Sequence, residues 1–266
     1  MIEEYFDKND LFNEDDYVKV FFDTEFTGLH KNTSLISIGL LADVDNVIKP
    51  SEDFDINDYS LSHRLSLPKI EQMPSFYGEC FDYNKNQVDD WLNENVIKNL
   101  RWNREHPFKY FNDLNNDGKN IEMNDWSFEI RDRLKEWLQR LHDETGKKIL
   151  FYSDCYAYDW VLLVELITDH KSAIDMPDYC YYIPIDLSTE LFSLGIDPDI
   201  NREQLLYSLK PNIGQLQKSY SEIFSGRTKH NALWDAFVIF GIFTSLKMIK
   251  TEEKSHLMKI KALLEK

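Results

Sequence analysis

Cysteine, glycine and proline are all scarce in this chain, which holds 3, 9 and 8 of them among 266 residues. The three cysteines, Cys80, Cys155 and Cys180, are scattered and form no C-x-x-C pair. Neither a disulfide framework nor a cysteine-based zinc site is therefore indicated. The shortage of glycine and proline is typical of a helix-rich globular chain without long flexible linkers.

A long apolar run is missing as well. No stretch approaches the roughly 18 apolar residues that would span a membrane, and the acidic first residues lack the apolar core of a signal peptide. The most apolar stretch, residues 232–246, contains Asp235 and is interrupted again at Thr244 and Ser245, so we interpret it as a buried helix. These absences predict a cytoplasmic protein that does not enter a membrane.

Positive charge is also in short supply, because 30 basic residues face 47 acidic ones and the formal net charge is −17. This balance argues against a broad cationic face that binds long nucleic acids. It does not exclude an enzyme that acts on nucleic acid, because bound divalent cations invert the local field at a carboxylate-rich site. A short substrate, in addition, needs few phosphate contacts.

Hydrophobic residues make up 42% of the chain and can form a sizeable core. Alternation and apolar periodicity predict a series of strands and helices. The predicted strands cover residues 17–22, 33–41, 46–49, 148–152 and 181–185. The predicted helices cover residues 88–100, the stretch between an N-cap at Asp125 and Gly146, and residues 158–167, 201–208, 229–249 and 252–265.

Strands first, followed by alternating helices and strands, predict an α/β fold with an open mixed sheet flanked by helices. No break in composition marks a second domain, so residues 1–266 are expected to form a single domain. We interpret residues 1–16 as an acidic arm. Residues 252–266 are expected to form a C-terminal helix that packs on the domain or on a second subunit.

Residues 21–28 read FFDTEFTG, an apolar strand that ends in Asp-x-Glu. Side chains at positions i and i+2 of a strand lie on the same face, so Asp23 and Glu25 can point together at one cation. Two carboxylates side by side suit Mg²⁺ or Mn²⁺ better than zinc. A solvated acidic turn is the competing interpretation in such an acid-rich chain.

Residues 229–235 read KHNALWD and open the most apolar helix. A carboxylate buried there needs a cation or strong donors, which makes Asp235 a candidate ligand. Favourable contact with the helix macrodipole is the alternative for Asp235, and an exposed loop position is the alternative for His230.

Residues 151–159 read FYSDCYAYD, where a buried strand ends and a helix begins. Ligand sites in such sheets lie beyond the carboxyl ends of the strands, so Asp159 can add a carboxylate there. Asp154 is the competing candidate, with capping of the turn as its alternative role.

The pieces DTExTG, YDxxxL and HxAxxD thus occur in chain order. Together they resemble the three motifs of the DEDDh (DnaQ-like) 3′–5′ exonucleases, over residues 17–249. The runs WLNENVI at 91–97 and FYSD at 151–154 are most similar to a group of bacterial and phage 3′–5′ exoribonucleases. The resemblance implies a ribonuclease-H-like fold.

The resemblance also implies roles for the motif residues. Asp23, Glu25 and Asp235 would bind one Mg²⁺ or Mn²⁺ ion. Asp23 would also bridge to a second ion, which Asp159 supports through water, and the two ions would clamp the scissile phosphate. His230 would take the proton from the attacking water. The substrate would be single-stranded RNA or a short oligonucleotide, cut from a free 3′ end to nucleoside 5′-monophosphates.

Other residues near the motifs are expected to contact the substrate. They are Thr24, Phe26, Thr27, Gly28, Leu29 and Arg227. Phe26 and Leu29 could wedge or stack the terminal base, with core packing as the alternative. Arg227 could touch a phosphate or lie on a solvated loop.

The chain departs from the exonuclease pattern in two ways. The spacing between Asp23 and Asp159 is long, so residues 51–124 are predicted to be an insertion that shapes the substrate channel. An acid stands at Asp154, where many relatives carry an amide near the active site.

Other functions compete with the exoribonuclease. They are a 3′–5′ exodeoxyribonuclease on single-stranded DNA, a non-catalytic nucleic-acid-binding protein with this fold, and a metal-dependent hydrolase of small nucleotides. A homodimer is possible by analogy with relatives.

Overall fold

A mixed β-sheet with helices on both faces forms the body of the protein in a computed structural model, which describes residues 12–44, 73–102, 109–113, 117–209 and 229–264. The strands are β1 (Tyr17–Phe26), β2 (Leu35–Asp43), β3 (Ser75–Cys80), β4 (Tyr110–Asp113), β5 (Asn120–Asp125), β6 (Lys148–Ser153) and β7 (Ile185–Asp186). Across the seven-stranded sheet they follow the order β4-β5-β3-β2-β1-β6-β7. The predicted fold class, α/β with a mixed sheet flanked by helices, is confirmed.

Strand β1 lies between β2 and β6, and its two neighbours run in opposite directions. It pairs antiparallel with β2 and parallel with β6. The parallel pairing puts the carboxyl ends of β1 and β6 at the same edge of the sheet. The first and second sequence motifs stand at these two strand ends, so the topology brings them together.

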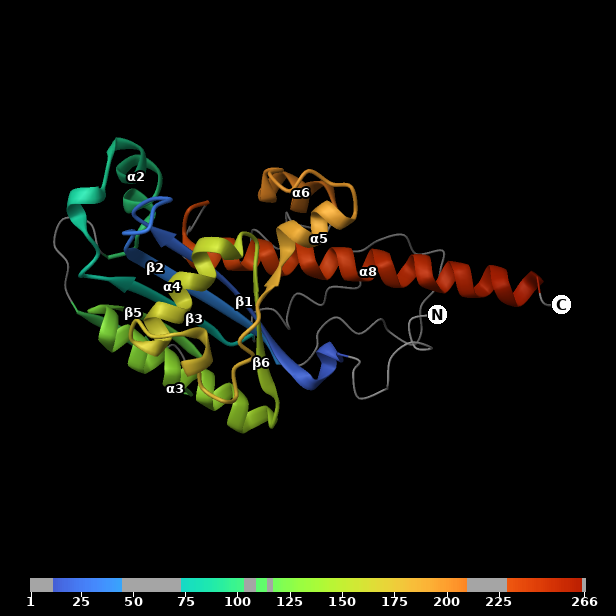
Figure 1. Ribbon diagram of the computed structural model, residues 1–266, viewed down its shortest axis with the longest axis horizontal. Coiled ribbons are helices and arrows are strands. Elements are labelled where there is room, and N and C mark those ends of the chain that lie inside the picture. The colour runs from blue at the N-terminus through green and yellow to red at the C-terminus, as the bar shows by residue number, and fades with distance from the viewer. Residues whose placement is uncertain (1–11, 45–72, 103–108, 114–116, 210–228, 265–266) are drawn as a thin grey trace.

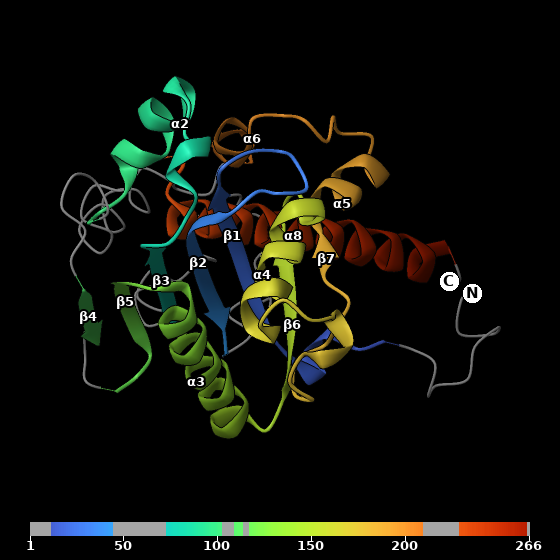
Figure 2. The same ribbon diagram turned by 60° about the vertical axis from the view of Figure 1, so that its left-hand side comes forward.

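Helices cover the sheet in two layers. The helices are α2 (Asp90–Asn95), α3 (Ser127–Thr145), α4 (Tyr156–Thr168), α5 (Leu187–Ser193), α6 (Arg202–Ser208) and α8 (Ala232–Leu264). Because side chains alternate along a strand, Val20 and Phe22 of β1 pack in one core cluster with α3 and α4, whereas Phe21 packs in another with α8. Figures 1 and 2 show α3 and α4 on one face of the sheet and α8 on the other.

Several predicted elements differ in their bounds. Asp125 does not cap α3, because it ends β5, and Trp126 occupies the N-cap without a side-chain hydrogen bond. The helix predicted over 88–100 is interrupted, with α2 followed by a separate 3-10 turn, Ile97–Asn99. The strand predicted over 181–185 is reduced to β7, and the pattern did not predict α5 behind it.

The two helices predicted over 229–249 and 252–265 are one helix, α8. It begins at Ala232 and continues through the polar residues near position 251 without a break. The strand predicted over 46–49 lies outside the described residues, as do residues 1–11 of the acidic arm. No helix in the described parts of the chain is both long and apolar enough to cross a membrane.

The segment 51–124, which was predicted to be an insertion, contributes strands to the interior of the sheet. Its described residues include β3 and almost all of β5, which are parallel neighbours inside the sheet, and β4 at the edge. They also include α2, which stands beside the first motif loop. Residues 51–72 of this segment lie outside the described parts.

Candidate metal centre

A cavity of about 480 Å³ opens at the carboxyl ends of β1 and β6. All five residues predicted to carry the chemistry line it, together with Asp154. These residues are Asp23, Glu25, Asp154, Asp159, His230 and Asp235. The three motifs, which are far apart in the sequence, therefore share one cavity.

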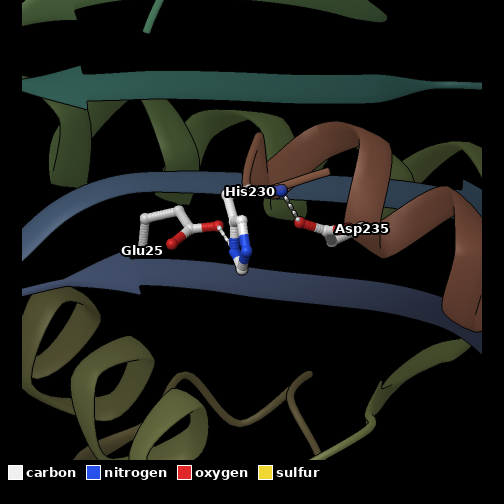
Figure 3. A group of neighbouring side chains, drawn as sticks. All are labelled: Glu25, His230 and Asp235. Atoms are coloured by element: carbon white, nitrogen blue, oxygen red, sulfur yellow. Dashed lines mark hydrogen bonds and ion pairs between the residues drawn. The ribbon is translucent and has the colours of Figure 1, made fainter. Parts of the chain in front are cut away.

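The first ligand group combines β1 with the start of α8. Oxygen or nitrogen atoms of Glu25, His230 and Asp235 all lie within 4.8 Å of one another. The Nδ1 atom of His230 is 3.8 Å from Oε1 of Glu25. Figure 3 shows the imidazole between the Glu25 side chain and the helix that carries Asp235.

The backbone at His230 is held by the acid that it faces. His230 has a left-handed conformation with φ of 64°, which is uncommon outside glycine and asparagine. Its N–H donates to Oδ2 of Asp235 at 2.8 Å. The next residue, Asn231, is fully buried and donates from Nδ2 to the hydroxyl of Tyr77 at 3.0 Å. The loop before α8 is thus fixed to β3.

The second ligand group combines β1 with the turn after β6. Carboxylate oxygens of Asp23, Asp154 and Asp159 lie within 4.8 Å of one another. Asp159 is 5% exposed, and its Oδ1 accepts from the backbone N–H of Thr24 at 3.1 Å and from the Thr24 hydroxyl at 2.5 Å. The hydroxyl of Ser153 donates to the other oxygen of Asp159 at 3.4 Å. Asp159 is therefore fixed from two strands.

A glycine in β2 allows α8 to begin next to these acids. Gly39 is paired with Asp23 across the β1–β2 ladder. A Cβ atom on Gly39 would lie only 2.2 Å from the backbone nitrogen of Leu233. Only glycine therefore permits the first turn of α8, and with it Asp235, to lie against the centre of the sheet.

The carboxyl groups carry strongly perturbed acidities. Burial, and then the nearby acids, raise the pKa values of Asp23, Glu25 and Asp235 well above their usual range. Burial also raises the pKa of Asp159 to about 7, although the bonds from Thr24 oppose this. These directions show that the site, without a cation, holds negative charge unfavourably.

The pKa of the His230 imidazole is shifted in the opposite direction. Burial, followed by the positive charge of Lys229, lowers the pKa of His230 below 6.5. His230 is therefore neutral at pH 7, with a nitrogen able to accept a proton.

The donor set fits a divalent cation of the magnesium type. Hard carboxylate oxygens dominate both groups, and these are the ligands that Mg²⁺ and Mn²⁺ prefer. A bound cation would favour the charged forms of Asp23, Glu25 and Asp235, whose pKa values are raised by burial and by the neighbouring acids. Asp23, Glu25, Asp159 and Asp235 are the residues that would hold it.

The residues predicted to contact substrate occupy different places. Thr24 and Phe26 line the cavity, and the Phe26 ring stacks on Tyr158 at 5.6 Å between centroids. Thr27 is buried and donates from its hydroxyl to Oε1 of Gln87 at 2.6 Å.

The rest of the first motif loop is turned away from the cavity lining. Gly28 donates its N–H to the hydroxyl of Thr33 at 3.2 Å, and Leu29 is 73% exposed. Arg227 lies outside the described residues.

The sequence did not predict roles for Trp91, which contacts His230 but is not part of the cavity lining, or for Arg202, which is part of it. Trp91 of α2 is 56% exposed, and its ring meets the His230 ring edge-on at 5.4 Å between centroids. Arg202 of α6 lines the cavity and forms an ion pair with Asp154. Trp91 stands in the run WLNENVI, which carries part of the family resemblance, whereas no sequence signal marked Arg202.

The segment that carries Trp91 is attached to the histidine loop. Asn99 donates from Nδ2 to the carbonyl oxygen of Lys229 at 2.9 Å. The indole therefore forms a fixed, open surface beside the imidazole.

Neither the family models nor the curated proteins compared with this chain give a match. The functional assignment accordingly depends on the geometry of this cavity and on the three motifs.

Proposed function

We propose that the protein is a metal-dependent 3′–5′ exoribonuclease of the DEDDh type, with the ribonuclease-H-like form of the α/β fold. The observation that supports this most is the convergence of the three motifs on one cavity, where Glu25, His230 and Asp235 form one group and Asp23 and Asp159 belong to a second. Hydrolysis of a phosphodiester needs this combination of charge neutralisation and a proton acceptor. The mixed sheet with helices on both faces is compatible with that fold.

Each residue has a defined task in the proposed reaction. When bound, Mg²⁺ or Mn²⁺ neutralises charge at the scissile phosphate and lowers the pKa of attached water. Asp23, Glu25, Asp159 and Asp235 hold the cations. His230 accepts a proton from the attacking water, a role that its neutral form allows.

The size and charge of the cavity favour a single strand with a free end. About 480 Å³ is the volume of a small-ligand pocket and accommodates one terminal nucleotide rather than a duplex. The net charge of −17 disfavours extended contact with a polymer. Trp91 offers an exposed ring beside His230 on which an unpaired base can stack.

A direct test is digestion of 5′-labelled RNA and DNA oligonucleotides of identical sequence, with Mg²⁺, with Mn²⁺ and with a chelator. We expect a ladder that shortens one nucleotide at a time from the 3′ end of RNA, release of nucleoside 5′-monophosphates, and arrest by the chelator. Glu25→Gln keeps the side-chain shape but removes one ligand charge, so it should abolish turnover.

The other outcomes identify the competing functions. Faster digestion of DNA would assign an exodeoxyribonuclease. Cleavage within the strand, or no hydrolysis of either polymer with either metal, would reject the exonuclease proposal.

A further inference from the structure

Arg202 of α6 is held in one position by acceptors from three parts of the chain. Its Nε donates to Oδ2 of Asp154 at 3.1 Å, and its Nη2 donates to the hydroxyl of Ser188 at 2.7 Å. Carbonyl oxygens of Pro198 and Ile200 accept from Nη2 and Nη1 at 2.8 and 2.9 Å. Every nitrogen of the guanidinium is thus used, so its plane is fixed relative to Asp154.

The backbone of Asp154 is fixed by the same cluster. Nη2 of Arg202 also donates to the Asp154 carbonyl oxygen at 3.4 Å, and the hydroxyl of Ser188 donates to that oxygen as well. The Asp154 and Arg202 side chains are 22% and 17% exposed. Side chain and backbone of Asp154 therefore have little freedom at the edge of the cavity.

The orientation of Asp154 matters because Asp23 and Asp159, two of the proposed metal ligands, lie next to it. Asp154 offers a carboxylate oxygen within 4.8 Å of oxygens from Asp23 and Asp159. A carboxylate that ligates a metal is commonly hydrogen-bonded on its other side, which sets its direction. The Arg202 contact to Oδ2 would set the direction of the Asp154 carboxylate in this way.

We propose that Asp154 is a further ligand of the cation held by Asp23 and Asp159, and that Arg202 is the residue that positions it. This inference rests on the proposed function, because it assigns residues within the same metal centre. Arg202 also balances one negative charge in a cavity where its carboxylates outnumber the two basic side chains, Arg202 and Lys229. The Asp154 carboxylate, for which the three motifs provide no role, then has a defined use.

The test is the affinity of the full-length protein for Mn²⁺, measured by calorimetry, with the number of bound ions counted by electron paramagnetic resonance. Arg202→Lys keeps the positive charge but cannot reproduce the planar fork, so a change in affinity reports orientation alone. We expect Arg202→Lys and Asp154→Asn each to lower the affinity for one of the two Mn²⁺ ions about 10- to 100-fold. The other ion should keep its affinity.

Arg131→Lys is the matched control. Arg131 is also mostly buried, at 21% exposure of its side chain, and it also pairs with aspartates, Asp132 and Asp169, but it does not line the cavity. Its replacement should leave both Mn²⁺ affinities unchanged. Circular dichroism and thermal melting of every variant separate a loss of ligand geometry from a loss of fold.

A double variant gives the decisive comparison. If Arg202 acts through Asp154, adding Arg202→Lys to Asp154→Asn causes no further loss of affinity. Unchanged Mn²⁺ binding in Asp154→Asn, or equal losses in Arg202→Lys and Arg131→Lys, would overturn the inference. Asp154-dependent Mn²⁺ binding without hydrolysis of any oligonucleotide would instead reject the exonuclease proposal and leave the ligand assignment in place.

Discussion

His230 stands in a backbone conformation that asparagine also adopts readily, so one substitution can remove the imidazole without straining the turn. We expect His230→Asn to lower kcat about 100- to 10,000-fold, because the proton acceptor is lost. Binding of Mg²⁺, measured by calorimetry, should change little, since the carboxylates remain. Normal kcat in a variant that binds metal would reject His230 as the base.

The pH dependence of kcat gives the control for this prediction. In the proposed reaction the base works in its neutral form, so kcat should rise with pH as the imidazolium loses its proton, and then level off. Because burial and Lys229 lower the pKa of His230, the midpoint should lie below the ordinary value of 6.5. The rise should be absent in His230→Asn when both proteins are assayed with saturating Mg²⁺.

Trp91 contributes an exposed ring beside His230, and the exposed Trp126 provides a comparison. Loss of a base-stacking surface costs about 1–3 kcal/mol, so Trp91→Ala should raise KM for RNA about 5- to 150-fold with little change in kcat. Trp126 is 45% exposed at the start of α3, and its ring contacts Phe81 instead of His230, so Trp126→Ala should leave KM unchanged. Equal KM values in the two variants would contradict the stacking role.

The sequence predicts the ligands of the site better than their surroundings. Asp23 and Glu25 are two positions apart on a strand, and His230 and Asp235 flank a helix start, so local spacing makes them candidates and the three motifs in chain order single them out. The contact of Arg202 with Asp154 joins two segments that lie far apart in the sequence, and no periodicity reports such a contact. The same holds for the ring contact between Trp91 and His230.

At the scale of elements, the approach of α8 to β2 sets the geometry of the first ligand group. A methyl group on Gly39 would meet helix backbone at 2.2 Å, so the first turn of α8 would have to move. We expect Gly39→Ala to reduce the free energy of unfolding by about 1–3 kcal/mol. It should also weaken Mg²⁺ binding, because Asp235 moves away from Glu25.

Gly241→Ala, farther along the same helix, is the matched control for Gly39→Ala. Its Cβ would meet the side chain of Leu206 at 2.9 Å, and a side chain can shift where a backbone cannot. Calorimetry should therefore find normal Mg²⁺ affinity in Gly241→Ala. Normal affinity in Gly39→Ala too would show that the close approach is irrelevant to the site.

Elements rich in apolar residues were predictable, whereas strands β3 and β5 were not. Helices α3 and α4 were found because their apolar residues recur at helical spacing, and strands β1, β2 and β6 were found because they contain short runs of apolar residues. Strands β3 and β5 contain the buried acids Glu79 and Glu122, so their pattern resembles a loop. These acids are satisfied by distant partners, since Glu79 accepts the backbone N–H groups of Arg101 and Trp102, and Glu122 pairs with the Arg101 side chain.

The continuity of α8 was missed for a related reason. A polar stretch near position 251 resembles the boundary between two helices, but the helix passes through it without interruption. Polar residues are compatible with an uninterrupted helix, because only glycine and proline strongly disfavour it.

For the whole molecule, the buried acids couple folding to pH and to metal. Asp159 has a pKa of about 7 in the folded protein and an ordinary value near 3.8, so the folded state binds its proton more tightly. The stability of the metal-free protein should therefore fall as pH rises from about 4 to about 7. A bound Mg²⁺ ion would stabilise the ionised Asp159 carboxylate and so offset this loss of stability. Mg²⁺ should therefore raise the melting temperature more at pH 8 than at pH 5.5.

Asp159→Asn tests the assignment of this effect. The amide does not titrate, so part of the fall in stability between pH 4 and pH 7 should disappear in the metal-free variant. Melting curves across this range with chelator present provide the measurement. An unchanged pH dependence in Asp159→Asn would show that other groups dominate it.

Helix α8 connects the proposed metal centre with the outer end of the molecule. Asp235 lies in the first turn of α8, and 33 residues at a rise of 1.5 Å each give a rod about 50 Å long, whose later turns extend beyond the sheet in Figure 1. A partner that bound the outer turns would therefore act on the same unbroken helix that carries Asp235 of the proposed metal centre, and a tilt of that helix would change the distance between Asp235 and Glu25.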